Sequence, residues 1–180
     1  MALSTHLKSA KEALRERNFA ETETNIAAAL KLAKSPEQLA QTNRLKLVAD
    51  YVKQFDRSLK TLMADENFDA GAELVIGKGT RVVVVERNPS MIVIRIAGMN
   101  KSYALASLPD GLAMALIDKR LDPNDPVTKI IKASYLAAAK VSTEDNQEKA
   151  KSLWEEARAV DPQGVGDLPM FLTDTYEFTE

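Results

Sequence analysis

The sequence predicts an α+β protein that is mainly helical, with helical hairpins flanking a small four-stranded antiparallel β unit. Apolar residues recur at three- and four-residue spacing through residues 7–62 and again through residues 112–157, as they do on one face of a helix. Between these stretches, residues 73–97 are rich in β-branched side chains and include four consecutive valines. Glycine, asparagine and proline interrupt that stretch at close spacing, which is typical of strands joined by tight turns.

The N-terminal third is expected to form a helical hairpin followed by one long helix. The apolar stripe of the hairpin, on either side of a turn at Arg17-Asn18, comprises Leu7, Ala10, Leu14, Ile26, Ala29, Leu30 and Ala33. Ser35-Pro36-Glu37-Gln38 then predicts a helix start, because serine can cap, proline suits the first helical position, and glutamine can reach back as in a capping box. We expect this second helical segment to end between Met63 and Asp65.

The long helix carries an apolar seam at strict three–four spacing: Leu45, Val48, Val52, Phe55, Leu59 and Leu62. Packing of this seam on the preceding hairpin is the favoured interpretation, and it predicts a monomer. A homodimer through the Leu45–Leu62 helix is the alternative, because such spacing also suits a coiled coil.

Residues 72–105 are expected to form a four-stranded antiparallel meander, either as an open sheet or as a small SH3-like barrel. Turn residues at Gly77–Thr80, Asn88–Ser90 and Gly98–Lys101 separate the predicted strands. Successive side chains on a strand point to opposite faces, so one face of the third strand should carry the core residues Ile92, Ile94 and Ile96.

Helices are expected to resume after Leu108–Gly111. A short helix around Leu112 and Leu116 comes first, Asp125-Pro126 then caps and begins another, and a last helix follows the polar turn at residues 142–147. The tail from residue 164 is expected to be irregular. The chain is thereby divided into residues 1–68 (hairpin plus long helix), 69–106 (β unit) and 107–180 (helical hairpin and tail), with one compact domain as the alternative.

Four residues of the last helix follow a small–aromatic–small–proline pattern: Ala150, Trp154, Ala157 and Pro162. This pattern resembles the second helix of a tetratricopeptide repeat, in which small residues let paired helices approach and the aromatic fills the gap. In the N-terminal hairpin Phe19, Ala29 and Leu30 fit, whereas Arg17 stands where glycine is usual. The resemblance implies tetratricopeptide-like helical hairpins, and no peptide-binding residue of that family is carried over.

A second resemblance covers residues 81–125. Its most distinctive stretches are Ile92–Ile96, Ser102-Tyr103 and Leu108–Ala113. With these stretches the segment is similar to a family of uncharacterised bacterial proteins found in planctomycetes. This resemblance implies no known activity.

We predict no catalytic, cofactor-binding or metal-binding residues. The chain has no cysteine, which removes thiolate chemistry and the common zinc-finger sites, and its one histidine, His6, is expected to be a solvated residue in the first helical turn. Gly77–Thr80 lacks the spacing of a phosphate-binding loop and precedes a strand, so a hairpin turn is predicted there. Prolines interrupt the acidic cluster of Asp118, Asp122 and Asp125, which is therefore expected to cap helices rather than bind calcium.

Positive charge gathers in the β unit although the chain has a formal net charge of −2. Residues 72–105 contain five basic and two acidic residues. The candidate partner-binding residues are accordingly Lys78, Arg81, Arg95 and Lys101. Protection of strand edges by these charges is favoured over nucleic-acid binding, because only Tyr103 is present to stack on bases. Arg95 is expected on an exposed sheet face; the alternative is a face covered by helices, where it would need a carboxylate partner or would line a groove.

These patterns favour a non-enzymatic protein-interaction or scaffold module that binds an unknown protein partner. The alternative is a nucleic-acid-binding protein that uses the basic β unit, and an enzyme with an unrecognised carboxylate site comes third. No apolar run approaches the roughly 20 residues needed to span a bilayer, so no membrane partner is expected. The N-terminal residues enter a polar helical pattern at once, which favours a cytoplasmic protein, with a fragment of an exported protein as the alternative.

Overall fold

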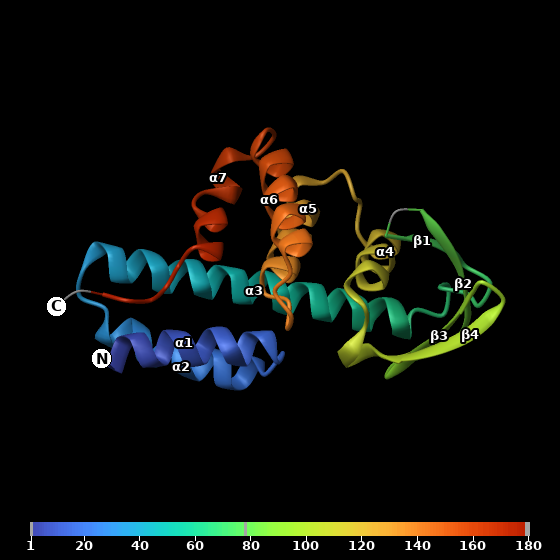
Figure 1. The fold of residues 1–180 in the computed structure, drawn as a ribbon, viewed down its shortest axis with the longest axis horizontal. Coiled ribbons are helices and arrows are strands. Elements are labelled where there is room, and N and C mark those ends of the chain that lie inside the picture. The colour runs from blue at the N-terminus through green and yellow to red at the C-terminus, as the bar shows by residue number, and fades with distance from the viewer. Residues whose placement is uncertain (1, 78, 179–180) are drawn as a thin grey trace. The chain divides into compact units, whose positions relative to one another are not determined.

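The computed structural model describes residues 2–77 and 79–178, and in these residues the protein has the mainly helical α+β fold that the sequence predicts (Figure 1). The chain divides into two compact units, Met1–Gln54 with Asn124–Glu180 and Phe55–Pro123. These boundaries differ from those expected at residues 68 and 106. The difference arises because one long helix contributes to both units, and because the N- and C-terminal helical segments belong to the same unit.

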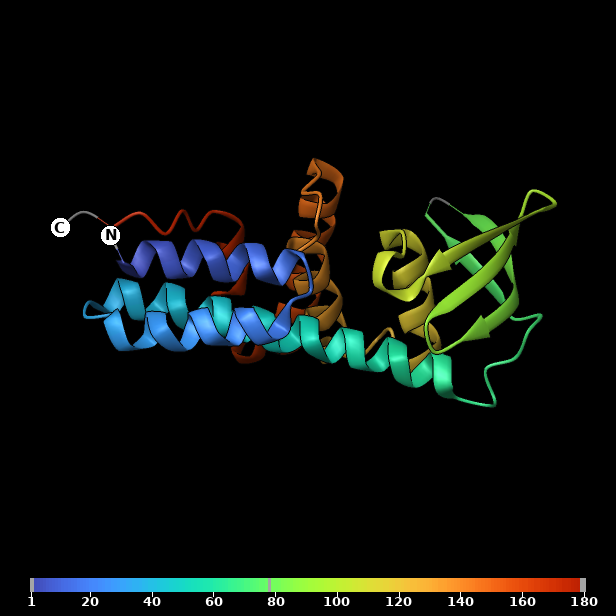
Figure 2. The same cartoon turned by 90° about the horizontal axis from the view of Figure 1, so that it is seen from below.

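The first unit is helical. Its elements are α1 (Ala2–Arg15), α2 (Phe19–Leu32), the first part of α3 (Pro36–Ala64), α5 (Pro126–Ala137), α6 (Glu144–Arg158), the short α7 (Pro162–Val165) and a 3-10 turn at Leu168–Leu172. Two pairs of helices, α1 with α2 and α5 with α6, lie side by side as hairpins (Figure 2). The tail is therefore less irregular than expected, because α7 and the 3-10 turn lie within it.

The second unit joins the end of α3 to the sheet. Its remaining elements are β1 (Glu73–Ile76), β2 (Thr80–Asn88), β3 (Met91–Ile96), β4 (Met99–Ala104), a 3-10 turn at Leu105–Ser107 and α4 (Asp110–Arg120). The strands form the predicted antiparallel meander in the order β1-β2-β3-β4, and α4 lies against β1. Among the described residues β1 and β4 are the two edges, so the meander is an open sheet rather than a closed barrel.

One face of the sheet is the core face. Its fully buried side chains are Leu74, Val82, Val84, Ile92 and Ile94, whereas Ile96 is half-buried. The turn between β3 and β4 consists of Ala97 and Gly98, both at positive φ, which matches the tight hairpin turns that suit the twist of antiparallel strands. Ile76 pairs with Thr80, so the predicted hairpin between β1 and β2 is present, although Lys78 itself lies outside the described residues.

A local signal fixes the start of α3, and an arginine from a later strand fixes its end. The predicted capping box is present: the Gln38 backbone N–H donates to Ser35 Oγ, and the Ser35 N–H donates to Gln38 Oε1, each at 3.2 Å. At the other end Arg87 of β2 donates to the carbonyl oxygens of Met63 (2.7 Å), Asp65 and Phe68. A cation there is favourable because the last carbonyls of a helix lack partners within the helix.

The seam of α3 is buried along its whole length. None of its six side chains, from Leu45 to Leu62, is more than 4% exposed. A homodimer through this seam would have to uncover side chains that the chain already covers. The monomer therefore stays our prediction.

Polar side chains at helix ends and between helices shape both hairpins. In the first, Arg17 takes a positive φ of 59° and Asn18 caps α2. His6 is half-buried and its Nδ1 lies 2.9 Å from Asn25 Oδ1, so it joins α1 to α2 rather than being solvated as expected. In the second, Asp125 caps α5 as predicted, by accepting a hydrogen bond from the Val127 N–H at 2.8 Å.

Trp154 on α6 is fully buried between two equally buried small residues of its own helix, Ala150 and Ala157. Truncating Trp154 to alanine should lower the free energy of unfolding by about 3–5 kcal/mol, because the cavity left behind can only partly collapse. Urea denaturation followed by circular dichroism measures this. Val160→Ala is the control, because Val160 is 71% exposed, and it should change stability by no more than about 0.5 kcal/mol. Equal stability of the two variants would contradict the packing role of Trp154.

Candidate functional site

The four residues predicted to bind a partner do not form one surface. Arg81 and Arg95 are both exposed on the face of the sheet opposite the core face. Lys101 pairs with Ile94 and is therefore on the other side of the sheet, exposed on the edge strand β4. Lys78 lies outside the described residues.

In the part of the sheet that the structure describes, the outer face carries as many acidic as basic side chains. Glu73 pairs with Val83 and Glu86 with Val93, which places both carboxylates on the same face as Arg81 and Arg95. All four charged side chains are exposed. Arg95 Nε also donates to Asn100 Oδ1 of β4 at 3.1 Å. The exposed sheet face expected for Arg95 is thus found, but in its described part this face is not a basic patch.

A buried cluster of charges lies elsewhere, in the first unit. Arg44 of α3 is 3% exposed at its side chain and donates to Asp174 (2.6 Å to Oδ1) and to Asp167 (2.6 Å) of the C-terminal segment. Lys11 of α1 donates to the carbonyl oxygens of Phe171 (3.4 Å) and Asp174 (3.3 Å), and its Nζ lies 4.8 Å from the centroid of the Phe171 ring. Burial lowers the pKa of the Lys11 ammonium. These contacts hold the C-terminal segment to α1 and α3, and we assign them a structural role.

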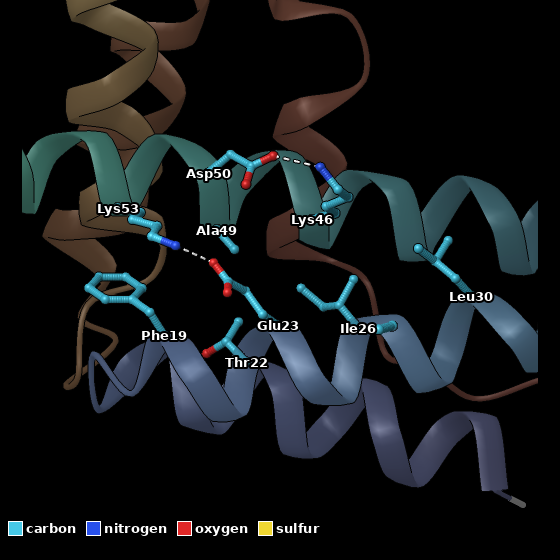
Figure 3. Close-up of a pocket in the computed structure, with 10 residues that line it drawn as sticks. Phe19, Thr22, Glu23, Ile26, Leu30, Lys46, Ala49, Asp50 and Lys53 are labelled. Carbon is cyan, nitrogen blue, oxygen red and sulfur yellow. Dashed lines mark hydrogen bonds and ion pairs between the residues drawn. The ribbon is translucent and has the colours of Figure 1, made fainter.

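An open apolar groove between α2 and α3 is the strongest candidate for a binding site (Figure 3). It has a volume of about 280 Å³. We call it the α2–α3 groove. It is lined by Phe19, Thr22, Glu23, Ile26, Ala27 and Leu30 of α2 and by Lys46, Ala49, Asp50 and Lys53 of α3.

The groove exists because small side chains stand where the two helices face each other. Figure 3 shows Ala49 of α3 opposite Thr22 and Ile26 of α2, with Phe19 at one end and Leu30 at the other. A methyl group at position 49 reaches only a short way toward α2, so space stays open between the two helices. Phe19 and Leu30 are only half-buried, which leaves apolar surface at both ends.

The rim of the α2–α3 groove carries two cations and two anions. Lys46 Nζ lies 2.9 Å from Asp50 Oδ2 one turn along α3. Lys53 pairs with Glu23, and this ion pair crosses from α3 to α2 (Figure 3). Along α3 the rim therefore alternates as positive, negative, positive, while α2 contributes one negative charge. The rim as a whole is neutral.

The lining favours contact rather than reaction. Its one hydroxyl, that of Thr22, donates to the Asn18 carbonyl oxygen at 2.8 Å and so is engaged by its own helix. The two carboxylates are each paired with a lysine. An apolar surface with a few charges at its edge is suited to binding an apolar group and orienting it.

The sequence contains little that could have located this groove. The residues of α2 and of α3 that line it each fit an ordinary amphipathic pattern. Only the approach of the two helices reveals that Thr22 and Ala49 leave space between them. Sequence reasoning instead selected the β unit, where the basic residues stand out by composition.

No protein-family model, curated protein or solved structure matches this chain. Across residues 2–77 and 79–178, no group of three or more histidine, aspartate or glutamate side chains is placed to hold a metal ion. In the same residues, no helix combines the length and apolar character needed to cross a membrane.

Replacing Arg44 with methionine should lower the free energy of unfolding by about 3–5 kcal/mol, because it leaves the buried carboxylate of Asp174 without its cation. Lys46→Met is the matched control on the same helix. It removes only an exposed ion pair and should cost no more than about 1 kcal/mol. Urea denaturation measures both. If Arg44→Met proves as mild as the control, the buried cluster does not hold the C-terminal segment in place.

Proposed function

We propose that this chain is a non-enzymatic protein-interaction module, and that it binds a partner protein through the α2–α3 groove. The observation that carries the proposal is the apolar groove, with Ile26 and Ala49 at its buried floor, beneath a charged but neutral rim. Protein-binding surfaces commonly combine an apolar centre with a polar edge. Antiparallel helices that leave such a groove between them are a common way to present it.

Binding would draw its affinity from apolar surface that is already partly exposed. Phe19 and Leu30 are half-buried at the two ends of the groove. Covering apolar area contributes roughly 25 cal/mol for each Å² removed from water. Aromatic side chains such as Phe19 bury a large area with few rotatable bonds, so they are effective anchors of an interface.

A protein partner is favoured over nucleic acid because the positive charge of the β unit is not free to act together. Arg87 is engaged by the carbonyl oxygens at the end of α3, and Glu73 and Glu86 balance Arg81 and Arg95 on the outer face. Binding to nucleic acid depends on several cations that neutralise phosphates together. An enzyme with a carboxylate site has no specific observation in its favour, since Arg44 engages both Asp167 and Asp174.

Filling the groove tests this function. Ala49→Met should leave the protein folded, because the longer side chain enters existing space, and should abolish capture of the partner. Ala40→Met is the matched control, because Ala40 is exposed on the same helix and does not line the groove. The tagged chain and both variants are expressed in the native host, and the co-purifying proteins are quantified by mass spectrometry.

We expect a protein that is recovered with the wild type and with Ala40→Met but is lost with Ala49→Met. Circular dichroism on each purified variant shows that the loss is not unfolding. Recovery of the same proteins with all three chains would contradict a role for the groove. Recovery of RNA in their place would favour the nucleic-acid alternative.

The chain should bind no oligonucleotide at roughly 50 mM salt, where non-specific electrostatic binding is favoured. Fluorescence anisotropy of labelled single-stranded RNA and DNA measures this. The control replaces Lys78, Arg81, Arg95 and Lys101 with glutamine. If the wild type binds and this folded variant does not, the β unit is a nucleic-acid surface and our proposal is wrong.

A further inference from the structure

We infer that the segment occupying the α2–α3 groove is an amphipathic helix whose flank toward α3 carries an acidic, a basic and an acidic residue in that order. This inference rests on the proposed function and adds to it the chemistry of the partner. It follows from the length of the groove, from the nature of its floor and from the alternation of charge along its rim.

The length of the groove suits a short helix that lies over it and inserts side chains. The groove runs along α2 from Phe19 to Leu30, which is roughly 16 Å at a rise of about 1.5 Å per residue, or three helical turns. A helix of three or four turns presents apolar residues at i, i+3, i+4 and i+7 along one face. Such a stripe matches an apolar groove that is lined by two neighbouring helices.

The apolar floor favours a helix over an extended strand. An extended peptide would turn backbone N–H and C=O groups toward the floor, where Ile26 and Ala49 offer no hydrogen bond. The hydroxyl of Thr22 is already donated to the Asn18 carbonyl oxygen. Buried backbone groups without partners are costly, whereas a helix satisfies these groups internally.

The rim then specifies the charges of the partner. Lys46 and Lys53 lie two turns apart on α3, about 10 Å, which is also the repeat of residues i and i+7 on a partner helix. Each ammonium group has three N–H donors, and the ion pair described above engages one of them. Two acidic residues seven positions apart would therefore each reach a lysine.

Asp50 and Glu23 complete the charge pattern of the rim and select the rotation of the partner helix about its own axis. Asp50 lies between the two lysines along α3, so the partner residue opposite it should be basic. The rim of α2 contributes Glu23, which disfavours a second acidic flank on that side. Like charges placed opposite each other are repelled, so the rim selects one rotation of the partner helix about its axis.

Two synthetic peptides test the inference on the whole chain. Both are acetylated, amidated 14-residue helices with the same leucine stripe. One flank of the first peptide carries Glu, Lys and Glu, with the two Glu seven positions apart. The same flank of the second peptide carries Lys, Glu and Lys at these positions. The first should bind about tenfold more tightly by isothermal titration calorimetry, since exposed ion pairs contribute a few-fold each.

A protein variant in which the signs of all four rim charges are exchanged is the matched control for the two peptides. E23K, K46E, D50K and K53E together keep the net charge and preserve both ion pairs with their signs exchanged. The preference between the two peptides should then invert. Ala49→Met should abolish the binding of both peptides to either form of the protein.

Each remaining outcome overturns the inference in a different way. If both peptides bind the wild type equally and Ala49→Met abolishes that binding, the groove accepts helices but its rim does not select their charges. If neither peptide binds while a native protein is still captured through Ala49, the partner segment is not a helix of this kind. In both cases the proposed function stands, because only capture that is independent of Ala49 contradicts it.

Discussion

The buried seam of α3 is the constraint on which both compact units depend. One continuous helix supplies Pro36–Gln54 to the first unit and the remainder, to Ala64, to the second. Its start is fixed locally by the Ser35 capping box, whereas its end is fixed by Arg87, which comes from a strand more than twenty residues later. Each unit therefore buries part of the same apolar seam.

The elements were predictable because their signals are local. The capping box, the turn residues between strands and the alternation of Ile92 and Ile94 each lie within a few residues of the structure that they specify. The buried ion pair between Arg44 and Asp174 was not predictable, since 130 residues separate its partners and an arginine on a helix is more often exposed. The α2–α3 groove was missed for a different reason: it depends on how closely two helices approach, which the pattern within either helix does not indicate.

Charge counted along a sequence says little until strand register is known. The β unit has more basic than acidic residues, yet alternation along its strands sends Lys101 to one side of the sheet and Arg81 to the other. Register then places Glu73 and Glu86 on the same face as Arg81 and Arg95. Arg87 does not add to the charge of the outer face, because its guanidinium donates to carbonyl oxygens at the end of α3. Among the described residues, a local excess of positive charge therefore becomes a balanced outer face once strand register is known.

In the α2–α3 groove, the apolar floor would supply affinity for a partner and the charged rim would supply selectivity. Ala49 and Thr22 are small and leave space above a buried apolar floor, so a partner gains free energy by filling that space with apolar groups. The rim charges are already paired, and all are exposed except the half-buried Lys53, so each pair is worth no more than about 1 kcal/mol. A partner of matching pattern can rearrange them at little cost, whereas a mismatched partner would place like charges together. The floor thus favours apolar segments in general, and the alternating rim discriminates among them.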